Sequence, residues 1–222
     1  MDSSFAERLV AWQKKYGRNN LPWQKSHDPY VRWLAEIMLQ QTQVKTVIPY
    51  FDRFIERFPT VQDLAEAPEE EVMKLWAGLG YYSRARNLHK CAKEVQCRFN
   101  GSFPIELSDL ESLPGIGVST AAAIRSAATD EPCAILDGNV KRVLARHGMI
   151  GKGLTPRETE NLLWADARSK TPLKEGRTYA QAVMDLGATV CIRTKPLCAL
   201  CPVNQDCKAF QTDSQLEFPV KK

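Results

Sequence analysis

A pair of glycines near the middle of the chain restricts the possible folds more than any other feature. The segment Leu113–Gly117 reads LPGIG, and Val118, Ser119, Thr120 and an alanine-rich run follow it directly. Two glycines one residue apart permit a tight turn that exposes backbone N–H groups, and Ser119 and Thr120 are well placed to cap the next helix. A glycine turn that leads into a helix N-terminus can bind an anion. Because no Lys-Ser or Lys-Thr pair follows Gly117, the expected anion is a backbone phosphate of a polymer, not a nucleotide.

A single acid follows further along, between an apolar run and a basic helix start. Residues 135–142 read ILDGNVKR, which places Asp137 just before a predicted helix at residues 140–146. Taken alone, Asp137 is most simply a helix N-cap, and the glycine turn is most simply a connection between two helices. Their combination with the features described below favours a functional interpretation of both.

The chain is predicted to be all-α. Apolar residues recur at helical spacing, and no alternating pattern is long enough to indicate a β-strand. The predicted helices cover residues 5–16, 29–38, 47–58, 83–99, 107–113, 121–127, 140–146, 156–168 and 178–186, with two short helices opening near residues 61 and 69.

Composition narrows the class of protein. Hydrophobic residues make up 44% of the chain and charged residues 25%, as in an ordinary globular protein. No apolar run approaches the length of a membrane span, so we expect no membrane contact. The N-terminal MDSSFAERL lacks a signal pattern, which predicts a location in the cytoplasm, such as the bacterial cytosol or nucleoid. The formal net charge of +4 is too small to indicate nucleic-acid binding by itself, so the placement of the cations matters more.

The predicted helix from residue 29 contains a candidate catalytic acid. Its apolar neighbours are Leu34, Ile37 and Met38. If Glu36 points inward among them, its pKa should rise. An exposed helical glutamate is the simpler interpretation, but Gln40, Gln41 and Gln43 follow at once and offer uncharged hydrogen-bonding groups beside the acid.

Residues 78–82 read GLGYY and lead into a basic helix that Ser83 is predicted to cap. Its cations, which lie mainly off the apolar face, are Arg84, Arg86, Lys90, Lys93 and Arg98. This order of glycines, tyrosines and cations is typical of a surface that binds nucleic acid, where the cations contact phosphates and the aromatic rings contact bases. A solvated basic helix with two interfacial tyrosines is equally consistent with this pattern.

Four of the seven cysteines lie near the end of the chain, with the spacing C-x6-C-x2-C-x5-C. They are Cys191, Cys198, Cys201 and Cys207. Four thiolates in one short segment indicate a soft metal centre, and both zinc and an iron–sulfur cluster accept four cysteines. The loop between the first two carries Arg193 and Lys195, so a metal-stapled basic loop would suit a phosphate contact.

Taken together, these motifs resemble those of the helix-hairpin-helix DNA glycosylases of the endonuclease III type. Leu113–Gly117 resembles their hairpin, Asp137 stands where they have a catalytic aspartate, and the cysteine spacing matches their four-iron cluster loop. Within that superfamily, residues 35–43, 78–82 and 136–142 resemble the adenine DNA glycosylase (MutY) family. The resemblance runs from about Trp12 to Cys207.

The resemblance implies an all-α fold of two lobes. A six-helix barrel with the hairpin would cover residues 21–133, an iron–sulfur lobe would combine residues 1–20 with 134–210, and residues 211–222 would form a loose tail. It implies a [4Fe–4S] cluster on the four late cysteines. It also implies a monomer that binds double-stranded DNA containing an adenine:8-oxoguanine or adenine:guanine mispair, with Glu36 on one wall of the cleft and Asp137 on the other.

The implied reaction is removal of the mispaired adenine by hydrolysis of its N-glycosidic bond, after the base is flipped out of the duplex. Protonated Glu36 would donate to a ring nitrogen, and ionised Asp137 would stabilise or trap an oxocarbenium-like sugar. Asn139 would orient Asp137 or the deoxyribose, and Ser119 would line the same side.

The resemblance also suggests DNA contacts. Gln41 and Tyr81 are candidates to fill and wedge the base stack, and Trp23 and Leu39 are candidates to contact the flipped adenine. The remaining predicted DNA contacts are Gln40, Leu79, Gly80, Tyr82, Gly115, Gly117, Val118, Lys141, Arg142, Arg193 and Lys195.

Two features depart from the family pattern. Relatives with lyase activity carry a lysine just after the hairpin, where this chain has Ser119, which predicts a monofunctional enzyme. The chain also resembles only the catalytic part, without the C-terminal domain that helps recognise 8-oxoguanine, so we expect weak discrimination between 8-oxoguanine and guanine. The alternatives are a glycosylase for another mispaired base, such as thymine opposite guanine, a non-catalytic DNA-binding module, and a zinc-binding structural protein.

Overall fold

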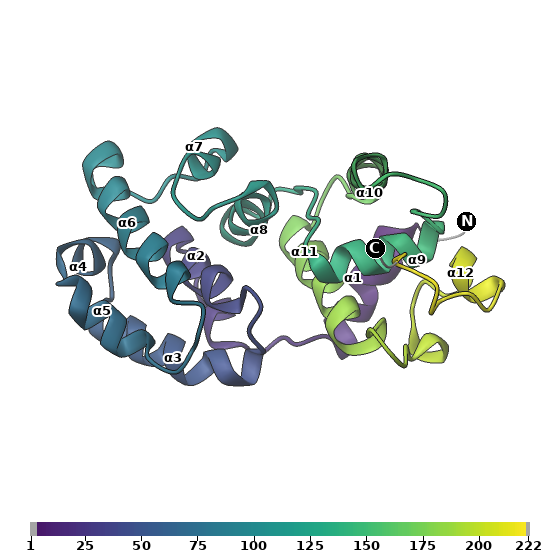
Figure 1. Cartoon of the computed structure of the whole chain (residues 1–222), viewed down its shortest axis with the longest axis horizontal. Helices are drawn as coiled ribbons and strands as arrows, with labels where there is room; N and C mark the ends of the chain where they lie inside the picture. Colours follow the sequence, from purple (N-terminus) through teal and green to yellow (C-terminus); the bar gives the residue numbers. More distant parts are fainter. Residues whose placement is uncertain (1–3, 221–222) are drawn as a thin grey trace. The chain divides into compact units, whose positions relative to one another are not determined.

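The computed structural model describes residues 4–220, and all regular secondary structure in this part of the chain is helical. The prediction of an all-α fold is therefore confirmed. The chain divides into two compact units (Figure 1). We call Asn20–Thr129 the continuous unit, and we call the split unit the chain up to Asn19 together with the chain from Asp130 onward. Within residues 4–220, no helix is long and apolar enough to cross a membrane.

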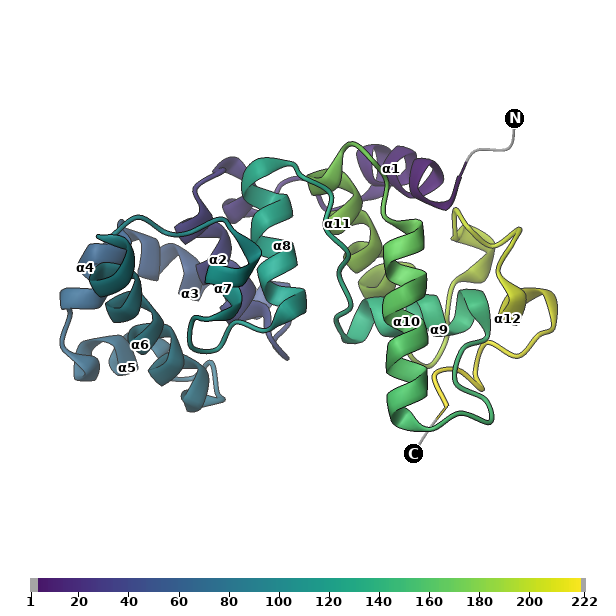
Figure 2. The same ribbon diagram turned by 90° about the horizontal axis from the view of Figure 1, so that it is seen from above.

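The continuous unit is a bundle around large aromatic side chains. Its helices are the 3-10 turn η1 (Pro22–Lys25), α2 (Pro29–Leu39), α3 (Val44–Arg57), α4 (Val61–Glu66), α5 (Glu69–Trp76), α6 (Tyr82–Phe99), α7 (Leu107–Glu111) and α8 (Val118–Thr129). Helix α2 runs through the middle and packs on α3, α6 and α8 (Figure 2). Trp33, Phe54 and Trp76 are 0% exposed, so the core of this unit depends on burial of large apolar surfaces.

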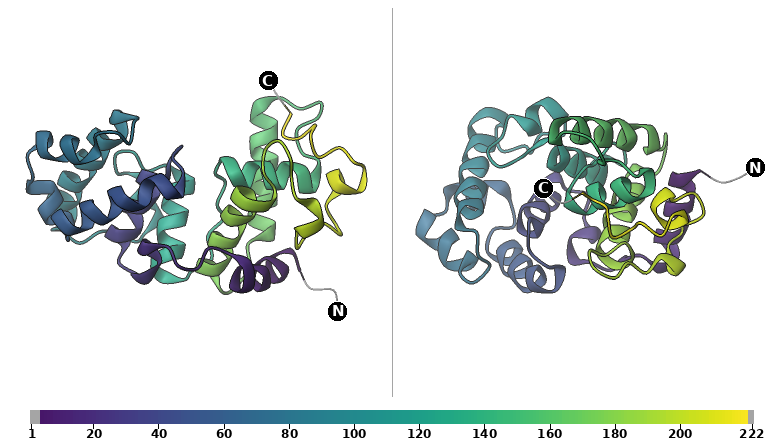
Figure 3. Two further views of the ribbon diagram at one scale, coloured as in Figure 1. Left: turned by 90° about the horizontal axis from the view of Figure 1, so that it is seen from below. Right: turned by 45° about the vertical axis from the view of Figure 1, so that its right-hand side comes forward.

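The split unit joins the first helix to the part of the chain that begins at Asp130. Its helices are α1 (Phe5–Tyr16), α9 (Gly138–Gly148), α10 (Pro156–Lys170), α11 (Gly176–Asp185), the π-helix η2 (Leu186–Val190), the 3-10 turn η3 (Cys198–Leu200) and α12 (Lys208–Gln211). Helix α1 lies against α11 (Figure 3). The junction is fixed by Asp185, which is 0% exposed and accepts hydrogen bonds from Gln13 Nε2 at 3.0 Å and Arg18 Nε at 2.8 Å.

Two predicted helix caps are wrong. Helix α6 begins at Tyr82, with Tyr81 at the N-cap, so Ser83 lies inside the first turn. Helix α8 begins at Val118, so Ser119 and Thr120 also lie inside the first turn. The preference for a serine cap contributes only about 1 kcal/mol, so it does not by itself decide where a helix begins.

The end of the chain is packed, which corrects the prediction of a loose tail for residues 211–220. Phe218 is 1% exposed, and its carbonyl accepts a hydrogen bond of 3.0 Å from Arg146 Nε. Ser214 is buried as well. The tail looked loose because its composition is polar, but one aromatic side chain with a place in the core is enough to fix it. Residues 221 and 222 lie outside the described part of the chain.

Candidate functional site

Asp137 is the N-cap of α9, as its place in the sequence predicted. Its Oδ1 accepts a hydrogen bond of 2.7 Å from the backbone N–H of Val140. Burial raises the pKa of Asp137, while the backbone N–H groups of Val140 and Asn139 and the cations Arg142 and Lys141 oppose that rise. The carboxyl group is therefore poorly hydrated and stands at the positive end of a helix dipole. A charge held in this way acts strongly on a neighbouring cation.

Asn139 and Arg142 belong to the same helix start, and both side chains turn toward the polypeptide. Arg142 Nη2 donates to Asn139 Oδ1 at 2.9 Å and to the Gly187 carbonyl at 2.6 Å, and Arg142 Nε donates to the Cys191 carbonyl at 2.8 Å. Arg142 thus donates to one carbonyl of the π-helix η2 and to the carbonyl of its C-cap residue, Cys191. The prediction of Arg142 as a phosphate contact is corrected to this extent: Nε and Nη2 are occupied by the protein itself.

The other cations of this unit that were predicted to contact DNA differ in their exposure and in their ion pairing. Lys141 forms an ion pair with Glu160 of α10, with 2.8 Å between Nζ and Oε1. Arg193 and Lys195 are exposed in the loop that follows Cys191. Their phosphate contacts stay predictions, and Lys141 would exchange Glu160 for a phosphate.

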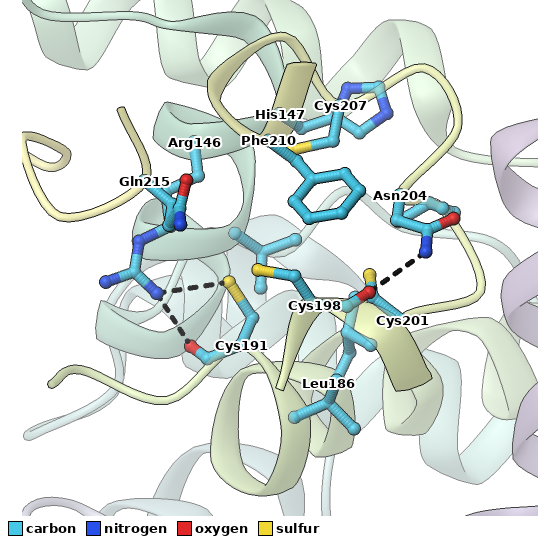
Figure 4. Close-up of a pocket in the computed structure, with 13 residues that line it drawn as sticks. Arg146, His147, Leu186, Cys191, Cys198, Cys201, Asn204, Cys207, Phe210 and Gln215 are labelled. Carbon is cyan, nitrogen blue, oxygen red and sulfur yellow. Dashed lines mark hydrogen bonds between the residues drawn. The ribbon is translucent and has the colours of Figure 1, made fainter. Parts of the chain in front are cut away.

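The four late cysteines line one pocket (Figure 4). Its apolar lining includes Val143, Leu186 and Val203. Arg146, which is 3% exposed, borders the pocket and donates from Nη1 to Cys191 Sγ at 3.4 Å and to the Ile192 carbonyl at 2.7 Å. Its Nη2 donates to the Arg193 carbonyl at 2.9 Å. One buried cation thus holds the start of the cysteine loop and, through Phe218, the end of the chain.

The thiols themselves are partly withdrawn from water. Burial raises the pKa of Cys201 to about 12 and raises the pKa of Cys198 and Cys207 as well. Among residues 4–220, no three His, Cys, Asp or Glu side chains are close enough together to hold a single metal ion. The four cysteine side chains surround one shared pocket instead. A metal-containing group that filled this pocket would be coordinated by sulfur atoms from several sides.

In the continuous unit, α2 carries the second predicted carboxylate. Glu36 is half-buried on this helix, and Leu39 is half-buried one turn further on. Trp23 of η1 is only 3% exposed, and its ring meets the ring of Phe51 edge-on with 5.3 Å between centroids. Trp23 therefore belongs to the core in this structure, and its contact with a flipped base stays a prediction.

The two predicted wedge residues share an uncommon backbone conformation. Gln41 has φ 58° and Tyr81 has φ 50°, both in the left-handed region that residues other than glycine rarely adopt. Both side chains are exposed, Tyr81 to 56%. Tyr82 beside it is 43% exposed, whereas Leu79 is 5% exposed and lies in the core. The prediction of a DNA contact by the Leu79 side chain is thus not supported by its burial.

Sequence reasoning missed the residue that joins these two loops. Arg84 was grouped with the outward cations of α6, but it is 9% exposed. Its Nη1 donates to the carbonyls of Met38 at 2.9 Å and Ile37 at 3.1 Å, and also to Gln40. Its spacing could have indicated that it is buried, because Arg84 lies one turn before Leu88 on the buried face of α6.

The glycine turn has the geometry that the sequence predicted. Gly115 has φ 81°, and a Cβ at this position would lie 3.2 Å from Asn87 Cβ. Leu113 and Ile116 are buried on the inner side, while Gly117 and Val118 are exposed at the start of α8. The turn therefore presents its backbone outward at a helix N-terminus, which is the arrangement of an anion site. Ser119 is half-buried in the first turn of α8.

The structure thus brings the predicted residues together in groups. Asp137, Asn139 and Arg142 form one group beside the cysteine pocket of the split unit. Gln41 and Tyr81 form another around Arg84 in the continuous unit.

Comparison with known proteins gives a consistent result. Over residues 34–168, the sequence matches the HhH-GPD superfamily of base excision DNA repair proteins. It is 44% identical over 218 residues to the adenine DNA glycosylase of Buchnera aphidicola subsp. Baizongia pistaciae, covering 98% of this chain and 62% of the relative. It is 42% identical over 222 residues to the adenine DNA glycosylase of Rattus norvegicus, covering 96% of this chain and 43% of the relative. The chain therefore spans less than two thirds of the length of either relative.

A solved structure has the same fold over nearly its whole length. A thermostable thymine-DNA glycosylase superposes with a TM-score of 0.84 at 27% sequence identity. The superposition covers 94% of this chain and 95% of that one.

Proposed function

Because this chain belongs to the HhH-GPD superfamily of base excision DNA repair proteins, we propose that it is a monofunctional adenine DNA glycosylase. The family expected from the sequence motifs is confirmed. Its substrate would be double-stranded DNA in which adenine is mispaired with 8-oxoguanine or guanine. The observation that carries the proposal is the 44% identity, across 98% of this chain, to a relative named adenine DNA glycosylase.

The chemistry needs two carboxyl groups in different protonation states. Glu36 on α2 would act as the general acid and donate a proton to a ring nitrogen of the flipped adenine, which leaves poorly as an anion. Asp137 would remain ionised and stabilise the positive charge that develops on the deoxyribose. Burial raises the pKa of Asp137, but the Val140 and Asn139 N–H groups and the cations Arg142 and Lys141 oppose that rise and favour the ionised form. The fixed position on the Val140 N–H supports the role as well, because a preorganised charge need not reorient during the reaction.

The neighbours of Asp137 would keep it in place. Asn139 accepts from Arg142, which in turn bonds the backbone at Gly187 and Cys191. Asn139 is thereby fixed to orient the sugar or Asp137. A water molecule would complete the hydrolysis, and no protein amine takes part.

We also propose that Cys191, Cys198, Cys201 and Cys207 hold a [4Fe–4S] cluster. The fit rests on the shared pocket and on the Arg146 donor beside Cys191 Sγ, since a hydrogen bond from a cation would offset part of the negative charge of a thiolate-bound cluster. When bound, the cluster would supply rigidity to the loop that carries Arg193 and Lys195. Metal analysis of protein purified without oxygen tests this: iron with a broad visible absorbance is expected, and stoichiometric zinc would contradict it.

The function is tested with a panel of duplexes, each containing one mispair, followed by alkali to cleave abasic sites. We expect strand breaks at adenine opposite 8-oxoguanine or guanine. Binding without base release would indicate a non-catalytic DNA-binding module. Borohydride should trap little covalent complex with DNA, because Ser119 cannot form the Schiff base that a lyase requires.

One alternative substrate has an observation in its favour. The thymine-DNA glycosylase that superposes on this chain is matched over 95% of its length. A thymine:guanine duplex therefore belongs in the panel, and release of thymine in preference to adenine would replace the proposed substrate.

A further inference from the structure

Gln41 and Tyr81 occupy strained backbone conformations in two different loops of the continuous unit. One loop follows the end of α2, and the other precedes α6. A residue other than glycine stays in the left-handed region only when its surroundings determine the conformation. Exposed side chains supply little of that constraint, so it must come from the backbone side of each loop.

Arg84 supplies this constraint to both loops at once. From Nη1 it donates to the last carbonyls of α2, at Ile37 and Met38, and to Gln40 directly before Gln41. From Nη2 it donates to Thr42 Oγ1 at 3.0 Å, directly after Gln41.

The same Nη2 reaches the second loop, where it donates to the Gly80 carbonyl at 3.4 Å, directly before Tyr81. The Arg84 guanidinium lies 5.2 Å from the centroid of the Tyr81 ring and 5.4 Å from that of Trp76. The Trp76 Nε1 donates to the same Gly80 carbonyl at 3.0 Å. Both flanks of Gln41 and the residue before Tyr81 are therefore attached to one buried side chain.

We propose that Arg84 is the positioning residue that presents Gln41 and Tyr81 to DNA as a pair, a role that rests on the proposed glycosylase function. Arg84 touches no substrate itself. It fixes the distance between the two side chains that enter the base stack, and it ties both to α2, the helix that carries Glu36. Opening of the stack and delivery of the adenine to the acid are thus set by the same guanidinium.

Only arginine has the shape for this task. The planar guanidinium offers donors in a fixed fork and a flat face for an aromatic ring. Lysine in the same place keeps the positive charge at the end of α2, where the helix dipole favours it, but it cannot reach both loops. Arg84→Lys therefore separates the geometric role from the charge.

The matched control is Tyr30→Phe. The Tyr30 hydroxyl is buried in the same unit and donates to the Phe58 carbonyl at 2.7 Å. This control removes a buried hydrogen bond to a backbone carbonyl, as Arg84→Lys does, but at the first turn of α2, the opposite end of the helix from the Gln41 loop. Both variants are first compared by thermal melting and metal content, so that a loss of folding is visible.

The decisive experiment is a double-mutant cycle of Arg84→Lys with Tyr81→Ala, using a duplex with adenine opposite 8-oxoguanine. Single-turnover excision is measured for all four proteins, and base unstacking is followed with 2-aminopurine in place of the adenine. Arg84→Lys is expected to lower excision about 10²-fold, the scale for misplaced groups, with a matching loss of 2-aminopurine fluorescence. The double variant should lose less than the two single losses multiplied together, because part of the effect of Arg84 passes through Tyr81 and the rest through Gln41.

The outcomes separate this inference from the proposed function. A parental protein that releases no adenine overturns the proposed function. If the parental protein releases adenine but Arg84→Lys behaves like Tyr30→Phe, the inference alone is overturned. Strictly additive losses in the cycle overturn it as well, since they would mean that Arg84 does not act through Tyr81.

Discussion

Arg84 in the continuous unit and Arg146 in the split unit are both buried, and both donate mainly to backbone carbonyls. They differ in what they hold. Around Arg84 lie two exposed side chains on left-handed backbone, whereas around Arg146 lie the cysteine loop and the packed end of the chain at Phe218. The first arrangement holds two exposed residues in a strained backbone conformation, and the second borders the cysteine pocket. Substitutions in the first region should therefore affect function more than stability, and substitutions in the second should affect both.

Asp137 gives the largest expected effect, and it tests whether a residue of the split unit can be purely catalytic. Asp137→Asn should lower single-turnover excision by at least about 10³-fold, or roughly 4 kcal/mol of barrier, because the amide cannot offset positive charge on the sugar. The variant should still fold and should keep its metal content. DNA affinity should hold or improve, since a negative charge near phosphates is removed. Excision near the parental rate would reduce Asp137 to a helix cap.

Glu36 offers the corresponding test in the continuous unit. Glu36→Gln is nearly isosteric but cannot donate a proton in the same way, so excision should fall about 10²–10³-fold. Single-turnover rates on the same duplex provide the measurement. A substrate whose base leaves without protonation should be affected much less, and an equal loss on both substrates would argue against a general acid.

The helices of both regions could be predicted from the sequence because their apolar faces recur at helical spacing. Helix α1 matches its predicted bounds at residues 5–16, and Asp137 is the N-cap that its position indicated. The family could also be predicted from the sequence, since LPGIG, the segment around Asp137 and the cysteine spacing are separate motifs that follow one another in the order found in that family.

Arg84 and Arg146, which are buried, and Arg142, which is half-buried, could not be recognised by their charge. A cation on a helix is normally exposed, so Arg84 and Arg142 were assigned to phosphates. Their partners are mostly backbone carbonyls of distant segments, and a carbonyl has no sequence signature. Only the position on the helix indicated burial, because Arg146 lies three residues after the buried Val143 and therefore on the same face of α9. The helix starts at Tyr82 and Val118 were missed because serine and threonine favour the N-cap, and that preference of about 1 kcal/mol does not by itself decide where a helix begins.

Arg146→Lys tests the structural side of the comparison. Lysine cannot donate to Cys191, Ile192 and Arg193 together, so several buried carbonyls lose their donor. The free energy of unfolding should fall by about 2–4 kcal/mol, and metal content should fall with it. The exposed Arg168 on α10 provides the control, as Arg168→Lys should leave both unchanged. If Arg146→Lys keeps its metal and melts normally, the cysteine pocket does not depend on this cation.

Gly187→Ala tests the contact between η2 and the start of α9. A Cβ at Gly187 would lie 2.7 Å from Asn139 Cβ and 3.0 Å from the Asn139 carbonyl oxygen. The two segments must separate, which should cost about 1–3 kcal/mol of stability, and excision should fall because Asn139 and Arg142 shift. Gly138→Ala is the matched control for stability, since an added Cβ there meets nothing within 4 Å. Equal melting temperatures for the two variants would show that η2 and the start of α9 can separate without a loss of stability.

The smallest effect concerns the pH dependence of stability at Asp137, and it measures what a functional carboxylate costs the split unit. Burial raises the pKa of Asp137, so the folded protein binds a proton at this site more readily than the unfolded chain does. Ionised Asp137 therefore lowers stability at neutral pH, and this cost is lost as the pH falls through the folded-state pKa.

Asp137→Asn keeps the cap, because asparagine caps a helix about as well as aspartate, but it has no charge to bury. The variant should therefore melt higher than the parental protein at pH 7, by at most about 3 °C in a chain of this size, and the difference should shrink toward pH 4. A difference that does not change with pH would come from the cap hydrogen bond instead of the charge. A variant that melts lower at pH 7 would show that the carboxylate stabilises α9 more than its burial costs, and Asp137 would then resemble Arg146, whose main contribution is to the fold.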